Sequence, residues 1–122
     1  MKLKNIVIVV RDIRASIKFY NELFGLEVVF DGNTNVILTE GLVLQERKIW
    51  EETIGDSIIF NSKCFELYFE ERNIDRFIDR LERFYPDICY INDIIVYSNG
   101  KKVVRFYDLD GHIIEVATML IN

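Results

Sequence analysis

An internal repeat constrains the fold of this chain more than any single motif. The segments "DIRASIKFY" (12–20) and "NIDRFIDRL" (73–81) align without gaps, and "TEGLVLQ" (39–45) aligns with "DLDGHIIE" (108–115) on the glycines Gly41 and Gly111. The sequence therefore predicts one unit of about 60 residues that occurs twice. The second alignment also makes Gln45 and Glu115 equivalent positions, because each follows its glycine by four residues.

Each unit has the same predicted order of elements, strand-helix-strand-strand-strand. Apolar residues recur at helical spacing over 13–24 and 74–84, and Asp12 and Asn73 stand where helix caps are favoured. Gly25 and Pro86 are expected to end these helices. Short β-rich runs predict strands in "LKNIVIVV", "LEVVF", "NVILT", "LVLQE", "FELYFE", "ICYI" or "IIVYS", "KVVRFYD" and "HIIEVAT". The fold class is α+β, with two tandem βαβββ modules.

Composition narrows the classes of function. The 122 residues fit one domain, with module one at about 1–46, a connecting arm at 47–63 and module two at about 64–120. A net charge of −5 argues against a nucleic-acid surface, and the apolar run 6–10 is too short to cross a membrane. Cys64 and Cys89 form no Cys-x-x-Cys pattern, so we expect reduced thiols in or near the core of a cytoplasmic protein.

Two stretches resemble the vicinal oxygen chelate superfamily, which contains glyoxalase I, extradiol dioxygenases, fosfomycin-resistance enzymes and bleomycin-resistance proteins. They are "NIVIVVRDIRASIKFYNELFGLEVVF" and "VVRFYDLDGHIIEV", and the resemblance extends from Leu3 to Thr118. It implies that the paired modules form a curled mixed sheet around a central cavity, and that the protein is a homodimer.

The resemblance also implies positions for a divalent metal, on the first and last strands of each module. Those positions are Asn5 and Gln45, then Glu66 (or Phe65, if the strand is offset by one) and Glu115. Dioxygenase and fosfomycin-type sites need two histidines, whereas this chain has one, His112. Gln45, Glu66 and Glu115 would be an all-oxygen ligand set, which suits Mg²⁺ or Mn²⁺. A glyoxalase-like lyase or isomerase would use that ion, with Glu115 as a catalytic base.

A metal-free binding role is the favoured interpretation, because the usual histidine is missing. Family members without the metal include the bleomycin-resistance proteins, which sequester a cationic drug. Glu66 and Glu115 would supply negative charge for such a ligand, together with aromatic surface from three further residues. Those residues are Trp50, Tyr68 and Tyr107.

Structural alternatives to these roles remain open at the sequence level. Glu115 can reach water or pair with Arg105 on a neighbouring strand, and an exposed pair of that kind would say nothing about function. Tyr68 and Tyr107 can be core residues, and Trp50 can cover a sheet edge. The arm is expected to cover the cavity or to reach a second subunit. A structural or regulatory domain that has lost its pocket is the third possibility.

Overall fold

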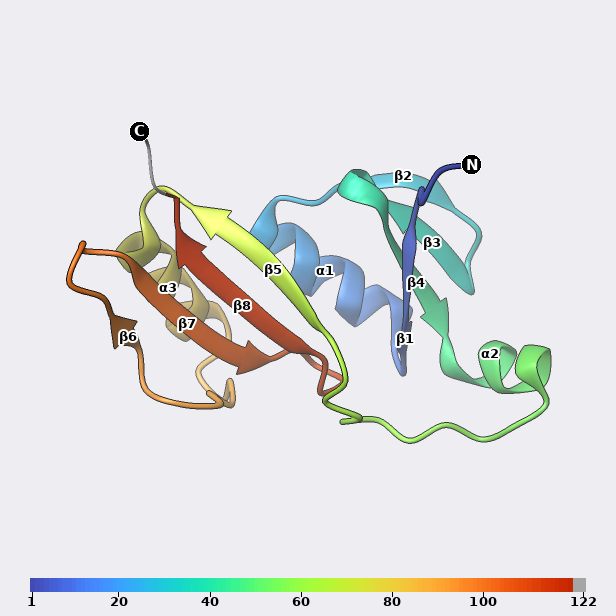
Figure 1. The fold of residues 1–122 in the computed structure, drawn as a ribbon. Coiled ribbons are helices and arrows are strands. Elements are labelled where there is room, and N and C mark those ends of the chain that lie inside the picture. Colours follow the sequence, from blue (N-terminus) through green and yellow to red (C-terminus); the bar gives the residue numbers. More distant parts are fainter. Residues whose placement is uncertain (120–122) are drawn as a thin grey trace. The chain divides into compact units, whose positions relative to one another are not determined.

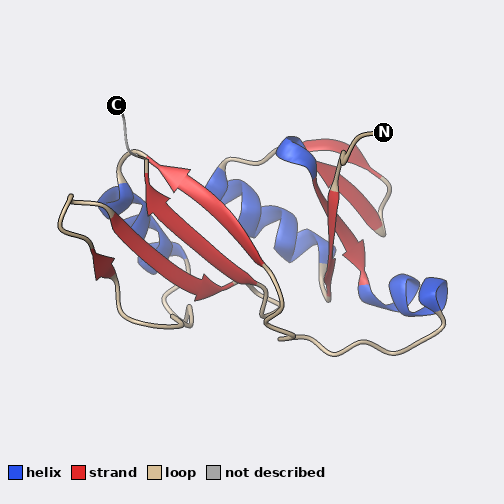
Figure 2. Cartoon of the chain, viewed as in Figure 1, coloured by secondary structure: helices blue, strands red, loops and turns tan. Residues whose placement is uncertain are grey.

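The computed structural model describes residues 1–119 and divides the chain into two compact units (Figures 1 and 2). The first unit spans Met1–Ile59, and the second begins at Phe60. Each unit contains one copy of the βαβββ repeat with a four-stranded mixed sheet of its own, which confirms the predicted α+β class. The predicted end of module two, residue 120, lies just outside the described residues.

The first unit has strand order β1-β4-β3-β2, and β1 runs parallel to β4. Helix α1 begins where the side chain of Asp12 accepts a hydrogen bond from the backbone N–H of Ala15, and it ends at Gly25, whose φ is 69°. The bounds are β1 Ile6–Val10, α1 Ile13–Phe24, β2 Val28–Asp31, β3 Asn35–Leu38, a 3₁₀ turn η1 at Thr39–Gly41, β4 Leu42–Glu46 and α2 Arg47–Ile54.

The second unit repeats this arrangement with strand order β5-β8-β7-β6, and β5 runs parallel to β8. Asn73 caps α3 by accepting from the backbone N–H of Arg76, and the helix ends two residues before Pro86. The bounds are β5 Glu66–Glu71, α3 Ile74–Phe84, β6 Ile95–Val96, β7 Lys102–Tyr107 and β8 Ile113–Thr118.

One face of the second sheet forms a core with α3. The ring of Phe77 on α3 lies 6.1 Å from that of Phe106 on β7, and Leu81 and Ile114 are fully buried with them. Since side chains alternate along a strand, this contact fixes which residues of β5, β7 and β8 face away from α3. We call that second side the open face of the sheet.

Three segments differ from what the sequence predicts. The connecting arm contains a helix, α2, for which no prediction was made; Glu46 caps it, because its carboxylate accepts from the backbone N–H groups of Lys48 and Ile49, both at 3.0 Å. "ICYI" contributes only an isolated bridge, and "IIVYS" shortens to the two residues of β6. The expectation of core thiols was wrong. Cys64 and Cys89 are both exposed, because each lies in irregular chain outside the helix-facing sheet surface.

None of the helices between residues 1 and 119 combines the length and the apolar character of a membrane span.

Candidate functional site

Strand register arranges the open face of the second sheet in rows. Tyr68 on β5, Glu115 on β8 and Arg105 on β7 are direct neighbours across the sheet. The next row consists of Glu66, Ile113 and Tyr107, and the row on the other side contains Glu70, Ala117 and Val103. The predicted parity of Glu66, Tyr68 and Glu70 therefore agrees with the register, and the open face contains both predicted tyrosines.

Glu115 lies at the centre of this face and pairs with Arg105. Its carboxylate atom Oε1 accepts a hydrogen bond from Arg105 Nε at 2.8 Å and lies 2.7 Å from Arg105 Nη2. Glu115 is only 7% exposed. This pair is the structural alternative that the sequence left open, but burial of the carboxylate distinguishes it from an exposed surface pair.

Glu66 completes a charged cluster with this pair. Burial and the neighbouring negative charge of Glu115, with which it shares a hydrogen bond, raise the pKa of Glu66, while Arg105 acts in the opposite direction. The guanidinium is hydrogen-bonded to Glu115, and it acts on Glu66 only through its charge. We refer to Glu66, Arg105 and Glu115 as the Glu–Arg–Glu cluster.

The aromatic side chains beside the cluster differ in accessibility. Tyr68 is 48% exposed, so it is not a core residue, whereas Tyr107 is half-buried. Tyr107 also lines a cavity of about 450 Å³, together with Phe84, Cys89 and Leu109 among others. The open face therefore offers one accessible phenol ring next to negative charge.

The first unit places its predicted residues differently. Gln45 is 9% exposed and hydrogen-bonded within its own unit: its Oε1 accepts from Asn35 Nδ2 at 2.8 Å, and its Nε2 donates to the backbone oxygen of Thr34 at 3.1 Å. The register sets Gln45 beside Val9, whereas Asn5 precedes the first residue of β1. Four residues of strand separate Asn5 from that row by roughly 13 Å, so the structure does not bring Asn5 and Gln45 together.

Trp50 lies on α2 and is half-buried. Helix α2 contacts β1 and β4 of its own sheet, so Trp50 belongs to the first unit. Its role in ligand binding stays a prediction.

The donor set of a divalent metal can be tested against these contacts. Two N–H groups of Arg105 already occupy Glu115 Oε1, and the side-chain amide of Asn35 occupies Gln45 Oε1. An oxygen-coordinated ion needs free carboxylate or carbonyl lone pairs, and a cation beside it weakens its binding by repulsion. With Glu115 Oε1 and Gln45 Oε1 taken and a guanidinium in contact with Glu115, the residues as arranged fit Mg²⁺ or Mn²⁺ poorly.

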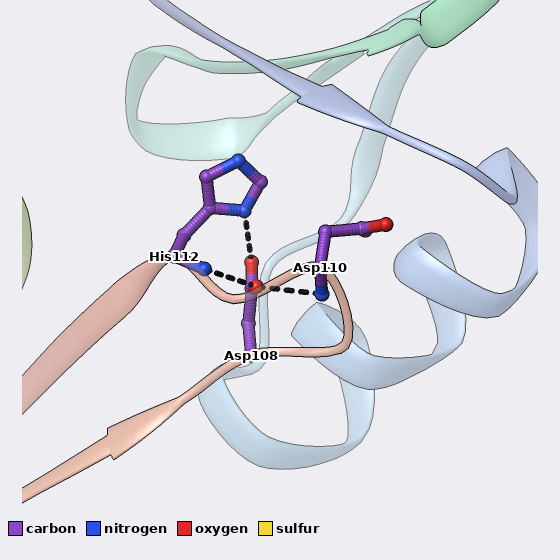
Figure 3. A group of neighbouring side chains, drawn as sticks. All are labelled: Asp108, Asp110 and His112. Atoms are coloured by element: carbon purple, nitrogen blue, oxygen red, sulfur yellow. Dashed lines mark hydrogen bonds and ion pairs between the residues drawn. The ribbon is translucent and has the colours of Figure 1, made fainter. Parts of the chain in front are cut away.

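A second group of possible ligand atoms lies in the turn between β7 and β8 (Figure 3). Atoms of Asp108, Asp110 and His112 lie within 4.8 Å of one another. Asp108 Oδ1 accepts from the backbone N–H groups of Asp110 and His112 at 2.9 and 2.8 Å, and its Oδ2 lies 2.7 Å from His112 Nδ1. The carboxylate of Asp108 thus closes the turn, and His112 has a structural partner rather than a position on the open face.

Gly111 completes this turn and is held closely by the chain before β5. Its φ is 86°, and a Cβ added there would lie 1.5 Å from the side-chain oxygen of Asn61. The turn therefore requires glycine for both its backbone conformation and its surroundings. It fixes where β8 begins, and with it the row in which Glu115 lies.

The chain is similar to known proteins over nearly its whole length. A model of the glyoxalase-like domain matches residues 3–121. The chain belongs to this family. This membership confirms the resemblance to the vicinal oxygen chelate superfamily that the sequence shows.

Solved structures agree with this membership of the glyoxalase-like family. A protein of unknown function from Agrobacterium tumefaciens str. C58 is 30% identical with a TM-score of 0.81, covering 98% of this chain and 95% of that one. A glyoxalase-related enzyme from Fulvimarina pelagi is 22% identical (TM-score 0.78, 97% and 88% covered). A fosfomycin resistance protein from Listeria monocytogenes is 16% identical (TM-score 0.74, 99% and 95% covered), so these last two show the fold alone. No protein with a curated description matches the chain.

Sequence reasoning undervalued two residues of these networks. Arg105 entered only as a structural partner of Glu115, although its alternation with Val103 and Tyr107 already placed it on the same face. Asn35 was missed because its contact with Gln45 depends on the register of the β3–β4 pair, which no local pattern specifies.

Proposed function

We propose that this glyoxalase-like protein binds and sequesters a small aromatic cation on the open face of its second sheet, without a metal. The observation that carries the proposal is the charge balance of that face. In the strands β5, β7 and β8, the residues that face away from α3 include the carboxylates of Glu66, Glu70 and Glu115 and a single guanidinium, that of Arg105.

The surplus negative charge favours a cationic ligand, because Arg105 compensates only one of the carboxylates. Tyr68 adds an accessible aromatic ring in the row of Glu115, and a cation over such a ring gains about 0.5–2 kcal/mol. Glu66 adjoins the same row and is an exposed residue. The face can therefore hold both the charge and the ring of one ligand.

Ligand screening tests this proposal. Thermal-shift measurements with cationic glycopeptides, thiol conjugates and aromatic metabolites should give a stabilising response for aromatic cations and none for matched anions. Tyr68→Ala and Glu66→Gln should each weaken the response, about tenfold in dissociation constant. Asp79→Asn removes the same charge from an exposed position of α3 and should leave it unchanged. Equal responses to cations and anions, or no loss in Tyr68→Ala, would contradict the proposal.

We further propose that the protein works as a homodimer in the cytoplasm. Strand β2 is an edge of its sheet, and its residues Val28, Val29 and Phe30 are 42%, 65% and 59% exposed, which is typical of a surface that a partner covers. The two free cysteines suit a reducing compartment. Light scattering should give twice the mass of the monomer for wild type, and the mass of a single monomer for Val29→Asp.

A further inference from the structure

We propose that the guanidinium of Arg105 takes the place of a divalent cation beside Glu115 and thereby keeps the site free of metal. The inference deepens the proposed function, on which it rests, because it assigns the metal-free state to one residue. Arg105 lies directly opposite Glu115 in the β7–β8 pair, so the strand register places the guanidinium beside the carboxylate.

The contact is too close for both cations to be present. Nε and Nη2 of Arg105 both converge on Glu115 Oε1, at 2.8 and 2.7 Å. A metal bound to that oxygen at the distances oxygen ligands require, about 2.0–2.6 Å, would lie against the guanidinium nitrogens and be repelled by their charge. A metal could bind Oε1 only after Arg105 had left, and a metal on the other oxygen of the same carboxylate would still be repelled by the guanidinium charge.

Arginine is suited to this role because it does not lose its positive charge by deprotonation. A histidine in its place would lose its charge near neutral pH and a lysine only at high pH, whereas a guanidinium keeps its charge at both. The side chain of Arg105 is 28% exposed and that of Glu115 is 10% exposed, so solvent screens the pair only partly. The cluster therefore has a permanent cation of its own.

Removal of Arg105 would leave two neighbouring carboxyl groups without a counter-charge. Glu66 and Glu115 come from the adjacent strands β5 and β8 and lie in neighbouring rows of the open face. Two such oxygen donors at short range are what a hard divalent ion binds. The wild-type chain thus carries a latent cation site that Arg105 fills.

Binding of Mn²⁺ alone tests the inference, with the full chain and no other ligand. Wild type, Arg105→Gln, Arg105→Lys and the double variant Arg105→Gln/Glu115→Gln are titrated with Mn²⁺ by electron paramagnetic resonance and calorimetry. Arg105→Gln should bind one Mn²⁺ at least tenfold more tightly than wild type and gain thermal stability from it. Arg105→Lys keeps the positive charge and should resemble wild type, and the double variant should lose the gained binding. Arg105→Met, which preserves the apolar stem, gives the same readout if Arg105→Gln does not fold.

Two outcomes would overturn the inference, and they separate it from the proposed function. Mn²⁺ affinity of the folded Arg105 variant no higher than that of wild type would show that Arg105 does not exclude metal, while metal-free binding of the organic cation would still stand. Stoichiometric Mn²⁺ on wild type that is lost in Glu115→Gln would overturn both.

Discussion

Replacing Gly111 with alanine should destabilise the protein far more than the same change at Gly100. The two glycines have nearly identical backbones, with φ of 86° and 85°, and both lie in turns of the second unit. Their surroundings differ. A Cβ at Gly111 would lie 1.5 Å from Asn61 Oδ1 and 2.6 Å from its Cγ, whereas among the described residues no atom lies within 4 Å of a Cβ at Gly100.

The magnitude follows from separating the backbone cost from the steric cost. An alanine in the left-handed region costs about 1–2 kcal/mol at either site, and the lower entropy of its unfolded chain returns about 0.4–1 kcal/mol. Gly100→Ala should therefore lower the free energy of unfolding by about 1 kcal/mol. Gly111→Ala must also displace Asn61, which adds about 1–3 kcal/mol of overpacking.

Urea unfolding followed by far-ultraviolet circular dichroism measures both variants. The decisive experiment adds Asn61→Gly, which removes the obstructing side chain and suits the left-handed backbone of position 61, where φ is 67°. In that background the two alanine substitutions should cost the same within about 0.5 kcal/mol. Equal costs in the wild-type background, or an undiminished difference after Asn61→Gly, would refute the steric argument for the turn that leads into β8.

Three further predictions concern other parts of the molecule. Arg14 donates to Asp31 at 2.6 and 2.9 Å, and together with a backbone N–H it lowers the pKa of the Asp31 carboxyl from 3.8 to about 2. The stability that the charged carboxylate contributes is therefore present above pH 3.8 and is lost as the pH falls through about 2. Carboxyl titration by nuclear magnetic resonance should show this midpoint move back toward 3.8 in Arg14→Ala, and an unmoved midpoint would contradict the assignment. Phe77→Ala should lower the free energy of unfolding by about 3–5 kcal/mol, against at most about 0.5 kcal/mol for the exposed Phe84→Ala, in urea unfolding. Asp108→Ala should cost about 2 kcal/mol and speed hydrogen exchange of the two turn amides it accepts from; protection equal to wild type would show that the carboxylate does not close the turn.

The helices and their caps could be predicted from sequence because their signals are local. Periodic apolar residues and Asp12 give α1 its observed bounds, and Asn73 does the same for the start of α3. Helix α2 was missed because its cap is the last residue of a strand, Glu46, and glutamate is not among the usual capping residues.

The candidate site could be predicted only in part. Alternation along each strand placed Glu66, Tyr68 and Glu115 on one face, since it depends on nothing outside the strand. The position of Asn5 relative to Gln45 depends on the register in which β1 pairs with β4. The alignment of the helix caps of the two modules does not determine that register. Whether Glu115 binds a metal or an internal cation likewise depends on which side chain lies opposite it across the sheet, and this is Arg105.

Parallel pairing of the first and last strand in each module has a consequence for synthesis on the ribosome. Strand β1 can pair with β4 only after the intervening helix and strands have been made, and β5 waits in the same way for β8. The first module can close its sheet once its own strands have emerged, and β5 then stays unpaired until the second module is nearly complete. A pause in translation between β5 and β8 would therefore prolong the interval in which the nascent chain is most prone to aggregate, and chaperone binding in that interval should map to β5.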